Sequence, residues 1–110
     1  MLSDKLSHRV DQPQTPIEDD GVLALHRLAQ IAQGESGQCR HVRRFLLGLY
    51  NGDKWPLDMT RLRALDGAIQ NDVLAVLRMD MTPRVEIHHR IEGGAELFRG
   101  WWHREQGDDE

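Results

Sequence analysis

The sequence predicts an all-α fold: a small bundle of three main helices, then an extended connector and a short C-terminal helix. Apolar residues recur at about 100° per residue through most of the segment from Gly21 to Asp80, as in amphipathic helices. Gly34 and the pair Asn51-Gly52 interrupt this pattern at helix-sized intervals. Only residues 84–91 alternate as a strand does, and a lone strand has no partner with which to pair.

The first helix is predicted from about Asp20 to Gln33. A carboxylate of Asp19 or Asp20 can accept hydrogen bonds from the unpaired N–H groups at its start. Gly34 can end the helix, because glycine adopts positive φ without strain. Its apolar side chains group on one side: Val22, Leu25, Leu28, Ala29, Ile31 and Ala32.

The second helix is predicted from about Ser36 to Tyr50, with Ser36 as the N-cap. Its apolar stripe consists of Val42, Phe45, Leu46 and Leu49. Three arginines project on the opposite side: Arg40, Arg43 and Arg44. Leu47 falls among these arginines, so the helical wheel places it on an arc that faces solvent.

The third helix is predicted from about Asp58, a good N-cap, to Asp80, and Pro83 prevents its continuation. A continuous apolar stripe spans it: Leu62, Leu65, Ile69, Val73, Val76 and Leu77. Asp66 projects inside that stripe. Because a buried carboxylate is costly unless it is hydrogen-bonded, we expect Asp66 to be a buried polar residue that accepts bonds from Trp55, His26 or backbone N–H groups.

Residues 84–91 are predicted to be an extended connector that packs on the helices. Gly93-Gly94 follows it, and a last helix is expected from about Ala95 to Arg104. This helix groups its large apolar side chains on one side, so it should close the core: Leu97, Phe98, Trp101 and Trp102.

The predicted domain organisation is one helical domain, residues 19–105, between two polar tails. Residues 1–18 are expected to be disordered or loosely attached, and residues 106–110 form an acidic tail. A domain of this size buries a modest core, which is compatible with self-association.

The charge of the chain is divided unevenly. The net charge is −4, but from Gly21 to Gly107 there are 12 basic and 10 acidic residues, so the body carries about +2. A near-neutral body does not have the charge balance of a nonspecific nucleic-acid binder. Twelve of the 14 basic residues are arginines, which favour bidentate contacts with carboxylates and phosphates.

Cys39 is the single cysteine, which excludes a disulfide framework within the chain and any zinc site that needs two thiolates. The sequence contains neither a signal-peptide core nor an apolar run long enough to span a membrane. We therefore expect a cytoplasmic protein without membrane association. His88, His89 and His103 lack the spacing of a metal site, and no catalytic residue, metal or cofactor is predicted.

Residues 21–104 resemble a family of short bacterial proteins of unknown function, found mostly on plasmids and integrated mobile elements. The stretches that carry the resemblance most specifically are Ser36-Gly37-Gln38, Phe45-Leu46-Leu47 and Leu65-Asp66-Gly67-Ala68-Ile69. The resemblance implies an accessory gene on mobile DNA. Such genes often act on host defence, replication or transfer by binding another molecule, and the family brings no catalytic residue with it.

The predicted interaction surface consists of Arg40, Arg43, Arg44 and Leu47, because an exposed apolar residue with arginines around it is typical of a protein interface. The leading hypothesis is a non-enzymatic accessory protein that acts by protein–protein contact, with host defence as a candidate target. The alternative is a nucleic-acid-associated protein that uses the same arginines, and a small enzyme is third. The sequence names neither the partner nor the oligomeric state.

Overall fold

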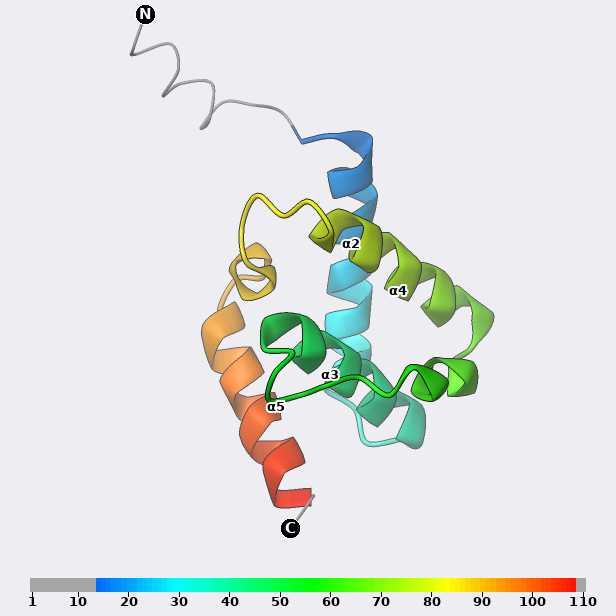
Figure 1. Cartoon of the computed structure of the whole chain (residues 1–110), viewed down its shortest axis with the longest axis vertical. Coiled ribbons are helices and arrows are strands. Elements are labelled where there is room, and N and C mark those ends of the chain that lie inside the picture. Colours follow the sequence, from blue (N-terminus) through cyan, green and yellow to red (C-terminus); the bar gives the residue numbers. More distant parts are fainter. Residues whose placement is uncertain (1–13, 109–110) are drawn as a thin grey trace, which may run out of the picture.

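A computed structural model describes residues 14–108 and confirms the prediction of a small all-α bundle (Figure 1). The described elements are the helices α2 (Pro16–Ala32), α3 (Gly37–Tyr50), α4 (Gly67–Asp80) and α5 (Gly94–Asp108), and the short 3-10 helices η1 (Met59–Ala64) and η2 (Ile87–Arg90). Of the predicted tails, residues 1–13 and 109–110 lie outside the described residues. Within residues 14–108, no helix has both the length and the apolar character to cross a bilayer.

The helices pack in the order α4, α2, α3, α5, so that α4 and α5 lie on opposite sides of the central pair (Figure 1). Helices α2 and α4 run antiparallel: Gly21 lies against Met79, and Arg27 pairs with Asp72 at 2.9 Å. A Cβ atom at Gly21 would lie 2.5 Å from the Cβ of Met79. A glycine at this position therefore permits the close approach of the two helices.

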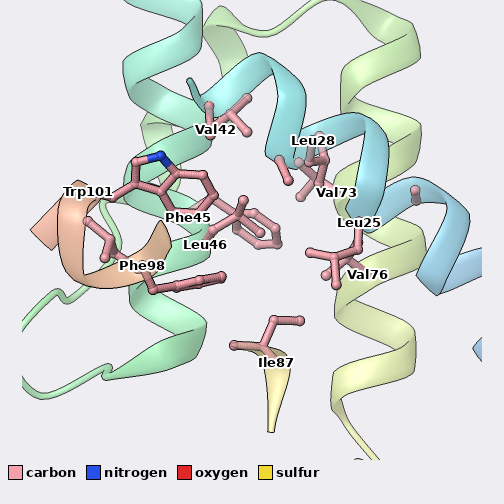
Figure 2. Close-up of a cluster of buried hydrophobic side chains, with 14 of the residues drawn as sticks. Leu25, Leu28, Val42, Phe45, Leu46, Val73, Val76, Ile87, Phe98 and Trp101 are labelled. Carbon is pink, nitrogen blue, oxygen red and sulfur yellow. The ribbon is translucent and has the colours of Figure 1, made fainter. Parts of the chain in front are cut away.

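The core draws apolar side chains from every α-helix and from η2 (Figure 2). Leu25 and Leu28 of α2 meet Val73 and Val76 of α4 on one side of it. The other members come mainly from α3 and α5: Val42, Phe45, Leu46, Phe98 and Trp101, with Ile87 of η2. The predicted stripes of the first two helices and the large apolar side chains of the last helix thus correspond to buried or partly buried positions.

Helix α2 begins earlier than predicted, and the expectation of a tail is wrong for residues 14–18. Thr15 is the N-cap: its Oγ1 accepts from the Glu18 N–H at 3.1 Å, and the Glu18 carboxylate accepts from the Thr15 N–H at 3.2 Å. This reciprocal capping box satisfies two N–H groups that the first turn would otherwise leave unpaired. Pro16 occupies the first turn, where its missing N–H costs nothing.

We expect the stability of shortened chains to depend on this first turn. A chain that starts at Asp19 should lose about 1–3 kcal/mol relative to one that starts at Gln14, because it lacks the cap and the Glu18 carboxylate. Urea denaturation of both chains measures the difference. Equal midpoints would contradict the structural role of residues 14–18.

The predicted third helix, Asp58 to Asp80, is in fact two elements, so this expectation was wrong for residues 58–66. Asp58 caps η1 instead, and its side chain accepts from the Thr60 N–H at 2.9 Å. Leu65 and Asp66 are extended, with ψ of 144° and 153°, and α4 starts at Gly67. At this break between η1 and α4, Leu65 is buried in the core, whereas Asp66 is exposed.

The connector and the last helix also differ from the prediction. Residues 87–90 form the 3-10 helix η2 rather than an extended segment, and its Ile87 is buried. Gly93, at φ 70°, reverses the chain before α5, a backbone conformation that glycine adopts without strain. Helix α5 continues to Asp108, so residues 106–108 belong to the helix rather than to the predicted acidic tail.

Candidate functional site

The arginine-rich side of α3 faces α5 and surrounds Glu105, whose side chain is 0% exposed. The Glu105 Oε1 atom accepts from the Nε of Arg40 at 3.0 Å and from the Nε of Arg44 at 2.5 Å. Its Oε2 atom accepts from the Nε of Arg43 at 2.8 Å. The predicted interaction surface is thus largely the contact between α3 and α5.

Arg43 is the most buried of the three arginines, at 2% exposed, and its placement on a solvent-facing surface was wrong. Its Nη1 atom also donates to the carbonyl oxygens of Ala32 and Gly34, both at 2.8 Å. These carbonyls lie at the C-terminal end of α2, where a cation is favoured by the helix dipole. Arg43 therefore connects α2, α3 and α5.

The placement of Leu47 on a solvent-facing arc was also wrong, because its side chain is 0% exposed. Helix α3 lies between α2 and α5 and buries more than one side (Figure 1). The helical wheel identified the arginine side correctly but could not show that another helix covers it.

The guanidinium groups control the ionisation of Glu105. Burial alone would raise the pKa of this carboxyl, but the hydrogen bonds from Arg44, Arg40 and Arg43 outweigh burial and lower the pKa from 4.5 to about 2. The carboxylate therefore stays ionised at neutral pH. Its three arginine partners hold it in an ion cluster that joins α3 to α5.

Asp66 is exposed, so its assignment as a buried polar residue was wrong. Its backbone N–H donates to the Gln38 Oε1 at 2.5 Å, and the Gln38 Nε2 donates to the Asp66 Oδ2 at 3.3 Å. The expected donors, Trp55 and His26, are not among these partners, and His26 instead contacts the Val22 carbonyl. Gln38 and Asp66 thus join the starts of α3 and α4.

A second ion cluster, which sequence reasoning missed, lies around Glu18. The side chain is buried, and its Oε2 atom lies 3.2 Å from the Nε of Arg84 and 3.5 Å from the Nη2 of Arg90. The hydrogen bond from the Thr15 N–H, followed by the charges of Arg84 and Arg90, lowers the pKa of Glu18 against the opposing effect of burial. Through these ion pairs, Arg84 and Arg90, which precede α5, contact the first turn of α2.

His88 and Cys39 contact neighbouring side chains of the described chain. Among residues 14–107, no group of three His, Cys, Asp or Glu side chains could hold a metal ion. The rings of His88 and His89 lie 4.1 Å apart, and His88 also packs edge-on against Tyr50. Burial, and then the neighbouring His89, lowers the pKa of His88. Cys39 accepts a hydrogen bond from the Ser36 hydroxyl at the start of α3.

An apolar feature that remains on the surface surrounds Leu74 of α4, which is 62% exposed. Leu74 borders two hollows of about 250 and 270 Å³. The first lies between η1 and α4, and the second between α2 and α4. We call Leu74 and the residues of both hollows the Leu74 face: Leu62, Arg63, Leu65, Gln70 and Val73 in the first, and Ile17, Asp20, Ala75 and Arg78 in the second.

Two sequence signals for these features can be recognised once the structure is known. Glu105 follows Phe98 and Trp101 at helical spacing, so it lies on the apolar side of the last helix. The helical wheel placed Asp66 on the apolar side of the predicted third helix in the same way. Leu74 is an apolar residue that lies off the stripe of α4. An apolar residue off the stripe of its helix is exposed only when no other helix packs over it.

Comparisons with known proteins yield one match. A family model matches residues 22–106, and its description is a family of unknown function (DUF7673). The matched range takes in η1, η2, α3 and α4 completely, together with most of α2 and α5. No curated protein and no solved structure matches the chain.

Proposed function

The chain belongs to this family of unknown function, DUF7673, so its activity has to be inferred from its own side chains, and we propose that it is a non-enzymatic protein that binds another protein through the Leu74 face. The observation that carries the proposal is the combination of an exposed leucine with a hollow on each side. A single exposed leucine is ordinary, but a leucine beside concave apolar surface is typical of an interface.

The composition of the Leu74 face supports a protein partner. Leucine, isoleucine and valine side chains contribute its apolar part, while Arg63, Gln70, Asp20 and Arg78 supply polar groups around it. Protein interfaces commonly have this arrangement of an apolar centre within a polar rim. The arginine-rich side of α3 favours nucleic acid less than the sequence suggested, because Arg40, Arg43 and Arg44 all bind Glu105.

The resemblance to short proteins of plasmids and integrated elements supports an accessory role on mobile bacterial DNA. We extend the proposal to a partner in the host cytoplasm, with the components of host defence as the class to test first. An enzymatic role has no comparable support, since the described titratable clusters around Glu105 and Glu18 are made of paired charges.

Leu74→Asp should weaken capture of a host protein by at least about 30-fold, as expected for a central contact worth ~2 kcal/mol. Leu23→Asp is the matched control, because Leu23 is 60% exposed on α2 and lines neither hollow. Pull-down from the native host, with thermal melting of both variants, provides the measurement. Equal capture by both variants would contradict the proposal, and loss of binding with rising salt would instead favour phosphate contacts.

A further inference from the structure

We propose that a second copy of this chain occupies the Leu74 face and forms a two-fold symmetric dimer. The inference rests on the proposed function only in that it uses the same surface, and it names a second copy, rather than a host protein, as the occupant of that surface. It is carried by two properties of the face: a protrusion and hollows that lie side by side, and two residues of opposite charge, Arg63 and Asp20, that border different hollows.

The shape of the face is suited to pairing with itself. Leu74 projects beside the hollow formed by Leu62, Leu65 and Val73. In a two-fold dimer the same patch is used by both copies, and the axis passes through the middle of the contact. An axis placed between Leu74 and this hollow seats the Leu74 side chain of each copy in the hollow of the other. One surface thus supplies both the protrusion and its receptor.

The charges favour the same arrangement. Arg63 borders the first hollow, while Asp20 borders the second, on the far side of Leu74. The two-fold rotation exchanges the two ends of the face, so Arg63 of each copy moves toward Asp20 of the other, and the contact is made twice. Arg78 also borders the second hollow and opposes part of this attraction. The apolar contact therefore supplies the affinity, while the ion pairs set the orientation.

The mass of the full chain in solution tests the dimer. Sedimentation equilibrium over the micromolar to millimolar range should give twice the chain mass of 12.7 kDa for the wild type and for Leu23→Asp. Leu74→Asp should give the mass of the monomer, because the substitution places a carboxylate in the apolar hollow of the other copy. A wild type that remains monomeric overturns the inference, as does a dimer that Leu74→Asp leaves intact.

A charge exchange tests the orientation without altering the apolar contact. Arg63→Glu and Asp20→Arg should each weaken dimerisation by roughly 2- to 30-fold, since each substitution removes two exposed ion pairs. The double variant should recover most of the wild-type affinity, because the opposite charges face each other again. A double variant that is no stronger than either single variant overturns the two-fold arrangement.

The two proposals fail in different ways. If the wild type is monomeric but captures a host protein through Leu74, the dimer is overturned and the proposed function stands. If the wild type dimerises through Leu74 and captures no host protein, the dimer is supported and the proposed function fails. Sedimentation of the purified chain therefore tests the dimer, and pull-down from the host tests the proposed function.

Discussion

Replacing Glu105 with glutamine is expected to destabilise the fold by about 3–5 kcal/mol, the usual cost of removing one partner from a buried ion pair. The side chain keeps nearly the same volume, so the loss reports the missing charge rather than a cavity. Without the carboxylate, the guanidinium of Arg43, 2% exposed, keeps carbonyl partners but no longer lies beside a compensating anion. Chemical denaturation with an unchanged m-value would measure the loss.

The control for this variant is Glu96→Gln, because Glu96 is an exposed glutamate on the same helix, α5. Surface substitutions of this kind usually change stability by less than ~0.5 kcal/mol. If Glu105→Gln were no more destabilising than Glu96→Gln, the ion cluster would contribute nothing to the fold, and the arginine-rich side of α3 would again be a candidate surface.

The same cluster should make stability depend on pH in a defined direction. Folding lowers the pKa of Glu105 from 4.5 to about 2, so the unfolded chain binds the proton more readily. The resulting stability is fully present above about pH 4.5 and is lost as the pH falls from there toward 2. The shift corresponds to about 3 kcal/mol. Glu105→Gln should remove this part of the acid-induced loss, which denaturation at several pH values would detect.

The second large effect is expected for Leu47→Glu. Because Leu47 is 0% exposed, the substitution removes a core leucine, a change that costs about 2–5 kcal/mol even when alanine replaces it. It also buries a carboxylate, which adds a desolvation cost. We expect the variant to lose cooperative unfolding at room temperature, in contrast to the small effect that a surface position would give.

Leu23→Glu provides the comparison, because it makes the same chemical change at an exposed leucine of α2. Thermal melting followed by circular dichroism should show a cooperative transition for Leu23→Glu near that of the wild type. A cooperative, unshifted transition for Leu47→Glu would mean that Leu47 is not part of the core.

The periodicity of the sequence located all the main helical segments, but it placed the start of α4 badly. The apolar residues from Leu62 to Leu77 keep helical spacing across the break at Leu65 and Asp66, so the pattern alone predicts one continuous helix. The break is held by the bonds between Asp66 and Gln38, which is 28 residues away. Local spacing contains no information about a partner at that separation.

The start of α2, in contrast, is determined by neighbouring residues and could have been predicted from the sequence. Thr15 and Glu18 have the spacing of a capping box, and Pro16 has a favoured place in the first turn. The two prolines of the segment and its many polar residues pointed instead to a tail. Local chemistry, rather than tertiary contact, would have been enough to place this boundary.

The sequence by itself determined the all-α class, the apolar stripes of α2 and α3, and the division of α3 into an apolar side and an arginine side. Only the tertiary structure decided that the arginine side is covered, because the covering group, Glu105, comes from a helix more than 60 residues away. Exposure depends on which helices pack together, whereas a helical wheel describes one helix alone. For the same reason Leu47 became part of the core, while Leu74, which no described helix covers, remained at the surface.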